Sequence, residues 1–156
     1  MIELKVQSSD LQKIVLELKN FGEDISLISE PLIDSAKYMQ RQAIANFGAS
    51  GSLMQDGGWP PLAQSTLVKK AVEWPGSPIM VRTGKLMNSF EIDSPRIGEN
   101  FGEIDVYNPV HYAVEHQEAW GVLPQRILLR FRKQQVQEVT NIFNNWIDKI
   151  IKKDFK

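Results

Sequence analysis

The chain has no cysteine among its 156 residues, and this absence narrows the chemistry open to it. Without thiols there is no disulfide framework, no thiolate metal site and no cysteine nucleophile. Histidine is scarce as well, since His111 and His116 are the only two. Folding must therefore rest on packing, and a chain of this length can remove roughly 68–70% of its unfolded surface from water.

No charge of one sign dominates, because 18 basic and 19 acidic side chains give a formal net charge of -1 at pH 7. Such a chain has no overall positive field with which to wrap nucleic acid, so any DNA contact would be local. No apolar run is long enough to span a bilayer, and charges interrupt the first residues where a signal peptide would be apolar. We expect no membrane contact and a cytoplasmic location.

Apolar residues near both ends of the chain repeat at helical intervals. One helix is predicted over residues 11–22. A second runs to residue 48, and its regular part is expected to begin near Glu30 because Pro31 is tolerated only in a first turn. Its predicted apolar face consists of Ile25, Ile28, Leu32, Ala36, Met39, Ala43 and Phe47. A long C-terminal helix is predicted with an apolar face made of Val136, Val139, Phe143, Trp146, Ile147, Ile150 and Ile151.

Strand patterns occupy the first residues and the middle of the chain. Residues 1–6 alternate apolar and charged side chains, the period of a half-buried strand. Residues 90–93 and 103–107 are predicted to pair as a hairpin, and the apolar run 127–131 fits a buried strand. Because helices flank this region without repeated strand-helix-strand spacing, we predict an α+β fold, with N-terminal helices and a long C-terminal helix packed on a small, mainly antiparallel sheet.

Shorter helices are predicted between these elements. Ser65 or Thr66 can cap a helix that runs through Lys70, and Thr83 can cap a helical turn that carries Leu86. Residues 110–117 have mixed helical spacing.

Residues 48–62 hold four glycines and two prolines. This composition disfavours helix and strand, and predicts an exposed, flexible loop of unusual length. Trp59 in this loop and Trp74 in the next irregular segment either anchor a partner or clamp these segments onto the domain's own core. Because no linker or repeat divides the chain, we predict a single domain over residues 1–156.

Groups that carry catalytic or metal chemistry are few. His111 and His116 are five residues apart, so a helix does not stack them as it would chelating histidines at i and i+4. Carboxylates gather near the predicted hairpin at Asp93, Glu99, Glu103 and Asp105. Solvated strand and turn positions explain these carboxylates better than a catalytic pair does. We predict no enzyme activity, no cofactor and no metal; a hydrolase that uses the histidines with nearby carboxylates stays an alternative.

One dense basic cluster consists of Arg126, Arg130, Arg132 and Lys133. It stands where the last helix begins, and positive charge there opposes the helix macrodipole. Either these are solvated side chains at a frayed end, or they form a patch for an acidic partner or a DNA backbone. The second reading leaves a small nucleic-acid-binding module as an alternative function. The predicted partner-binding residues are therefore Trp59, Trp74, Arg126, Arg130, Arg132 and Lys133.

Five motifs follow one another through the middle of the chain. They are GWPPL at 58–62, TL with KK at 66–70, VRTGKL with SF at 81–90, YAVEHQ at 112–117 and PQR at 124–126. In this order and spacing the chain resembles the phage virion morphogenesis family, which includes the tail-completion proteins of Mu-like phages. The resemblance covers about half of the chain.

The resemblance implies a non-enzymatic structural protein that acts in tail completion or head-tail joining. It implies a subunit of a homo-oligomeric ring, with head, connector or tail proteins as partners, located in the host cytoplasm during assembly and then in the virion. The chain departs from the family twice. Residues 118–120 separate the His-Gln pair from Gly121, where the family has a glycine very soon, and Ile127-Leu128-Leu129 replaces a Pro-Phe-Leu continuation.

Overall fold

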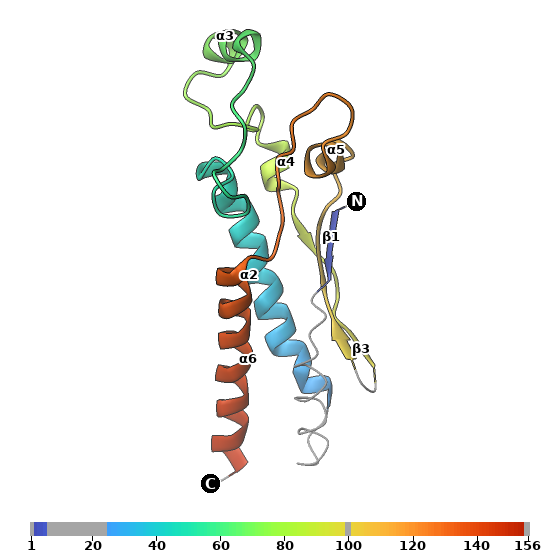
Figure 1. Cartoon of the computed structure of the whole chain (residues 1–156). Coiled ribbons are helices and arrows are strands. Elements are labelled where there is room, and N and C mark those ends of the chain that lie inside the picture. Colours follow the sequence, from blue (N-terminus) through green and yellow to red (C-terminus); the bar gives the residue numbers. More distant parts are fainter. Residues whose placement is uncertain (1, 6–24, 99–100, 155–156) are drawn as a thin grey trace. The chain divides into compact units, whose positions relative to one another are not determined.

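The structure is a computed structural model that describes residues 2–5, 25–98 and 101–154 (Figure 1). The fold is α+β, with helices and two small antiparallel sheets, as predicted. The chain forms two compact units. Unit 1 takes its described residues from within Met1–Leu4, Gln40–Glu91 and Tyr107–Arg130, and unit 2 from within Lys5–Met39, Ile92–Val106 and Phe131–Lys156. The single domain stays a prediction.

The first described helical segment is the 3-10 helix η1 (Ile25–Ile28), which leads into α2 (Ser29–Gly48). Pro31 lies in the first turn of α2, where proline costs no helical hydrogen bond, so the predicted start near Glu30 is confirmed. The predicted apolar face is confirmed by the buried residues Ile28, Leu32, Ala36, Met39, Ala43 and Phe47. The helix predicted over 11–22 lies outside the described residues.

The C-terminal helix α6 (Lys133–Asp154) is confirmed, but its buried face differs in part from the predicted one. Val139, Phe143 and Trp146 are buried, whereas Val136 is 51% exposed. Gln135 is buried instead, at 1% exposure. Residues 135, 139, 143 and 146 follow one row of i+4 and i+3 steps, and Val136 stands one residue, about 100°, away from that row.

The main sheet has the strand order β1-β5-β2, formed by β1 (Ile2–Lys5), β5 (Asp105–Asn108) and β2 (Glu91–Ile92). The predicted N-terminal strand and the pairing of the two central strand regions are both confirmed. The connection between β2 and β5 differs from the expected turn, because it forms a second, two-stranded sheet of β3 (Arg96–Gly98) and β4 (Phe101–Glu103). These two strands are antiparallel, with Ile97 opposite Gly102.

Gly102 explains how this second sheet packs within unit 2. A β-carbon at this position would lie 3.0 Å from Leu32 Cδ1 and 3.5 Å from Ile28 Cγ2. The absence of a side chain therefore lets β4 approach η1 and the start of α2 closely.

Three short helices belong to unit 1: α3 (Gln64–Glu73), α4 (Lys85–Asn88) and α5 (Tyr112–Glu118). The mixed spacing over 110–117 resolves into α5, and the cap predicted at Ser65 or Thr66 is wrong. Ala63 precedes α3, without a side-chain cap. Gly84 precedes α4, with φ +78°. A glycine suits this left-handed backbone. Thr83 stands one residue before this position, and its Oγ1 accepts a hydrogen bond from Lys85 N at 3.4 Å, so part of the predicted capping role is present.

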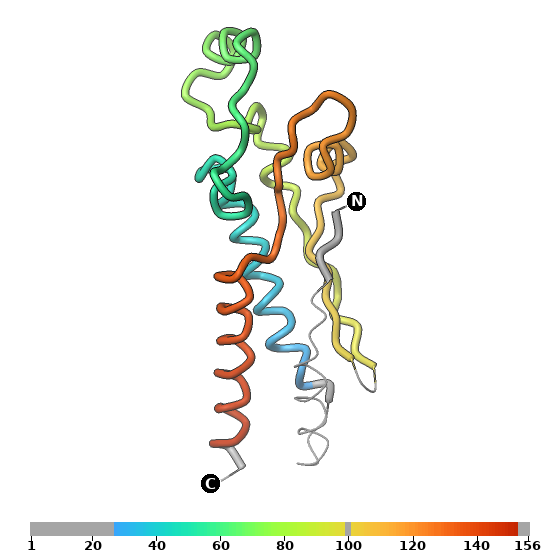
Figure 2. The backbone as a smooth tube through the Cα atoms, in the orientation of Figure 1, coloured from blue at the N-terminus to red at the C-terminus, as the bar shows by residue number. Residues whose placement is uncertain are grey.

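The apolar run at 127–131 is not a strand, although Ile127, Leu128 and Leu129 are buried as predicted. Figure 2 shows the segment that leads into α6 without helical turns, and residues 123–127 have no regular secondary structure. Side chains replace a neighbouring strand as hydrogen-bond partners. Gln117 Oε1 accepts from Leu128 N at 2.8 Å and Leu129 N at 3.3 Å, and Gln117 Nε2 donates to Leu129 O at 3.0 Å.

Side chains from another part of the chain bind the backbone of Ile127 in the same way. Its N–H donates to Gln55 Oε1 at 2.9 Å. Its carbonyl accepts from Asn46 Nδ2 at 3.1 Å and from Trp59 Nε1 at 2.9 Å. Buried backbone groups need partners, and here side-chain amides and an indole supply them. We call this set of contacts the amide clamp: Asn46, Gln55, Trp59 and Gln117 holding residues 127–129.

The segment 48–62 is wound into turns rather than being exposed throughout. Gly51, Met54 and Trp59 are buried, so the expectation of an exposed loop is wrong at these positions. The Trp59 ring meets Phe47 edge to face, with centroids 5.1 Å apart, and Trp59 N donates to Ser50 O at 2.7 Å. Trp59 therefore clamps the segment onto the core of unit 1, one of the two roles proposed for it.

Replacing Gln117 with methionine tests the amide clamp. Met has a similar size but leaves Leu128 N, Leu129 N and Leu129 O without these partners. We expect Gln117→Met to lower the free energy of unfolding by roughly 3 kcal/mol in urea denaturation. Gln137→Met, at an exposed site on α6, is the control and should change it by no more than about 0.5 kcal/mol. Equal effects of the two variants would contradict the role given to Gln117.

Substitutions at two glycines test whether the Trp59 ring packs against Gly51. Gly51 has φ +88°, and a β-carbon there would lie 2.2 Å from Trp59 Cδ1. Gly57 has φ +75° and nothing within 4 Å of such an atom. We expect Gly51→Ala to cost roughly 3 kcal/mol through backbone strain and displacement of the indole, and Gly57→Ala about 1 kcal/mol through strain alone. Thermal unfolding of both variants measures the difference; losses of the same size would show that Trp59 is not seated against Gly51.

Candidate functional site

A cavity of about 880 Å³ lies within unit 1. Its lining comes from the end of the 48–62 segment, α3, the segment 80–86, α5 and residues 122–126. Met80 in this lining has φ +66°, which is uncommon for a residue other than glycine. Such backbone conformations persist only where the surrounding structure holds them, and they gather at functional sites.

The cavity is cationic. Its charged lining residues are Lys69, Lys70, Arg82, Lys85 and Arg126, together with the titratable His116. No aspartate or glutamate is among the lining residues that the structure describes. Like charges that share one concave surface repel one another and raise the local concentration of anions. The cavity is therefore suited to an anionic group.

Arg126 is the most deeply placed of these cations, at 5% exposure. Its Nη2 donates to Pro60 O at 3.2 Å and Pro61 O at 3.4 Å, whereas its Nε is buried without a hydrogen-bond partner. Burial lowers the pKa of Arg126, yet a guanidinium keeps its proton at neutral pH. A charged side chain thus lies in the wall of the cavity with only neutral carbonyls as partners.

Lys70 and Trp74 place the C-terminal part of α3 against the cavity. Lys70 Nζ donates to Ser77 Oγ at 2.6 Å and to the Val81 carbonyl, and its burial lowers its pKa. Arg82 lies over the Trp74 ring, with Cζ 5.2 Å from the ring centroid, as a cation-π contact requires. These contacts tie α3 to the segment 77–82 and leave Arg82 itself exposed to solvent.

His116 projects from α5 into the cavity lining and is half-buried. Burial lowers its pKa first, nearby Arg126 lowers it further, and Glu115 acts in the opposite direction. Its Nδ1 is buried without a hydrogen-bond partner in the described structure, so no carboxylate orients the ring as a catalytic base would require. His111 is exposed.

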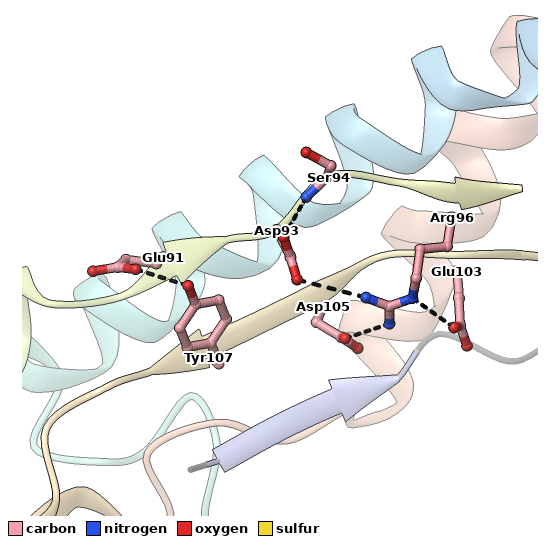
Figure 3. Close-up of polar contacts among 7 residues, drawn as sticks. All are labelled: Glu91, Asp93, Ser94, Arg96, Glu103, Asp105 and Tyr107. Carbon is pink, nitrogen blue, oxygen red and sulfur yellow. Dashed lines mark hydrogen bonds and ion pairs between the residues drawn. The ribbon is translucent and has the colours of Figure 1, made fainter.

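Figure 3 shows a second charged cluster, built around Arg96 in unit 2. Arg96 Nη2 lies 2.5 Å from Asp105 Oδ2, Nε lies 2.8 Å from Glu103 Oε1, and Nη1 lies 3.5 Å from Asp93 Oδ2. The hydrogen bonds that Arg96 donates to Asp105 and then to Glu103 raise the pKa of Arg96. Three of the carboxylates expected at solvated positions thus surround one arginine. The fourth, Glu99, lies outside the described residues.

This cluster has a structural role. Arg96 stands opposite Glu103 in the β3-β4 ladder, and Asp105 begins β5. The guanidinium therefore joins the two-stranded sheet to the strand that follows it, and neutralises carboxylates that would otherwise repel one another.

Figure 3 also shows a polar contact that belongs to unit 1, in which Tyr107 Oη donates to Glu91 Oε2 at 2.8 Å.

The predicted partner-binding residues differ in their exposure to solvent. Trp59 and Arg126 are buried, and Trp74 is partly exposed in the cavity wall. Arg130 is exposed in unit 1, whereas Arg132 and Lys133 belong to unit 2. The exposed basic patch is therefore wrong for Arg126, because its side chain lines the cavity, where binding of a partner stays a prediction. For the other three cations, partner binding stays a prediction.

Across residues 25–98 and 101–154, no group of three or more His, Asp or Glu side chains is placed to hold a metal ion. Among the helices that the structure describes, none has the length and apolar character needed to cross a bilayer.

No protein family model, curated protein or solved structure matches this chain. The resemblance to the virion morphogenesis family therefore stays a prediction that rests on the motifs themselves.

The cationic residues of α3 and of the segment 81–86 were not predicted as site residues. A signal for them was present, because Lys69, Lys70, Arg82 and Lys85 all stand within the motifs that carry the resemblance. Their convergence depends on contacts between segments tens of residues apart, such as that between Arg126 and Pro60. Spacing along the chain does not show such contacts.

The lowered pKa of His116 predicts a pH dependence of stability. Because the unfolded chain binds this proton more tightly, the stability from neutral His116 is fully present above about pH 6.5 and is lost as the pH falls towards the folded-state pKa. We expect His116→Asn to flatten the fall in the free energy of unfolding between about pH 7 and pH 5, measured by urea denaturation. His111→Asn is the matched control and should leave the fall intact; a fall unchanged in His116→Asn would contradict this assignment.

Proposed function

We propose that this chain is a structural protein of phage or prophage virion assembly that acts in tail completion or head-tail joining. The observation that carries the proposal is that all five motifs of the resemblance contribute residues to the lining of one cavity. One lining residue from each motif, in chain order, is Leu62, Lys70, Arg82, His116 and Arg126. Chance matches scattered along a chain have no reason to meet at one place in the fold.

The motifs also hold one another in position. Arg126 Nη2 bonds to the carbonyls of Pro60 and Pro61, and Arg126 N donates to His116 O at 2.8 Å. Gln117, the last residue of the fourth motif, holds the backbone that follows the fifth. This interdependence supports the view that the motifs are the signature of one folded unit.

The first departure from the family pattern, residues 118–120 between the His-Gln pair and Gly121, is compatible with this folded unit. Ala119 ends α5 with φ +58°, and Gly121 has φ +66°, so the extra residues form a loop in which Trp120 is 57% exposed. Gln117 and Arg126, on either side of the loop, keep their contacts. Most of these added residues therefore lie at the surface of unit 1, and the contacts of its interior are made on either side of them.

Exposed apolar residues on α3 support a role in assembly. None of the described residues of this helix is buried, and Leu67, Val68 and Val72 are 43%, 59% and 80% exposed. Apolar side chains that gather on a solvent-facing helix mark surfaces that another protein covers. We propose that the chain works as a subunit of a homo-oligomeric ring and docks to head, connector or tail proteins, first in the host cytoplasm and then in the virion.

Deleting the gene from a phage that encodes this chain tests the proposal. We expect unjoined heads and tails, or unfinished tails, in electron micrographs of the lysate, because the missing adaptor would leave the last assembly step undone. A plasmid copy of the gene should restore infectious particles. Normal particles in the deletion lysate, at wild-type titre, would rule out the assembly role.

A further inference from the structure

We propose that the cationic cavity of unit 1 binds an acidic, partly apolar segment of a partner protein. This inference deepens the proposed function and rests on it for the partner's identity as a virion protein. The binding site and the chemistry of its ligand rest on the cavity alone.

The positive charge of the cavity lining favours a negatively charged ligand. Five cationic side chains line the cavity, whereas the whole chain carries a formal net charge of -1. Lys69 has one carboxylate nearby, with Nζ 3.8 Å from Glu73 Oε1, but both side chains are largely solvated, so this pair neutralises little. The positive charge is thus local to the cavity and is not balanced within its lining.

Arg126 shows that the imbalance extends into the interior. Its side chain is nearly fully buried, its Nε has no hydrogen-bond partner, and no ion pair involves it in the described chain. A buried charge is costly unless an opposite charge and hydrogen bonds compensate it. A carboxylate in the cavity would supply the opposite charge, and arginine matches the planar geometry of a carboxylate.

The remaining cations are arranged to meet a longer ligand. Lys69, Arg82 and Lys85 are exposed and come from two separate segments of unit 1. Ala63, also in the lining, precedes α3 without a side-chain cap, so the N-terminal end of this ten-residue helix adds partial positive charge. Several acidic groups on one ligand can therefore be accommodated.

The apolar part of the lining favours a protein segment over free phosphate or nucleic acid. Leu62, Met80, Val81, Leu86, Val122 and Leu123 all face the cavity. Inorganic phosphate has no apolar group to pack on them, and a nucleic-acid backbone needs a basic track longer than one cavity. A peptide with both carboxylates and apolar side chains uses both kinds of lining, and a volume of about 880 Å³ lies within the range of ligand pockets.

A fluorescent peptide that alternates Glu and Leu, with four residues of each, tests the site against the full chain. Its partner probe carries Gln in place of every Glu. We expect the acidic peptide to bind in fluorescence anisotropy, with an affinity that falls as salt is added, and the Gln peptide to bind about tenfold more weakly or not at all.

A pair of double variants locates the binding. Arg82→Gln with Lys85→Gln removes two exposed cations of the cavity, and Lys37→Gln with Arg41→Gln removes two exposed cations of α2 that do not line it. We expect the first variant to weaken binding of the acidic peptide about tenfold and the second to leave it within about twofold of the wild type. Circular dichroism and thermal unfolding confirm that both variants are folded.

Several results would overturn the inference. They are no binding of the acidic peptide, equal binding of the Gln peptide, or the same affinity in both double variants. Inorganic phosphate or a mononucleotide that raises the melting temperature as much as the acidic peptide does would replace the protein segment with a free phosphate as the ligand. Binding in these assays is independent of particle formation, so a failure here and normal particles from the deletion phage are separate outcomes.

Discussion

The structure of unit 1 depends on how the buried backbone of residues 127–129 obtains its hydrogen bonds. None of the strands that the structure describes pairs with this segment, and Leu128 and Leu129 are almost completely shielded from water. Gln117 satisfies three of its backbone groups, and Asn46, Gln55 and Trp59 satisfy those of Ile127. Because unpaired backbone groups in the interior are costly, these side chains must stay in place together, and so must the segments that carry them.

The cavity follows from that constraint. Arg126 directly precedes the clamped residues, so its side chain is brought against the carbonyls of Pro60 and Pro61. Gln117 stands next to His116 on α5, which brings that ring to the same cavity. The interactions that stabilise unit 1 therefore also gather its cations, and the repulsion among them is a cost that an anionic partner can offset.

Elements with long, regular apolar patterns were predicted well. The face of α2 was correct because its apolar residues recur at three- and four-residue steps through five turns, and the strand β1 and the pairing of β2 with β5 were also correct. The errors occur where tertiary contacts replace local ones. The 48–62 segment has a loop composition, yet Trp59 buries part of it, and Gln135 takes a core position on α6 that polarity alone would assign to solvent.

The sequence by itself determined the fold class, the long helices and the absence of cysteine chemistry, because composition and periodicity are local properties that each segment carries with it. It also held the five motifs in order, from which the expected role in virion assembly comes. Only the tertiary structure decided that these motifs share one cavity, that Arg126 is buried while Arg130 is exposed, and that residues 127–129 are not a strand. The reason is physical: a backbone group accepts any well-placed partner, and which side chain comes near it depends on segments up to about 80 residues away in the chain.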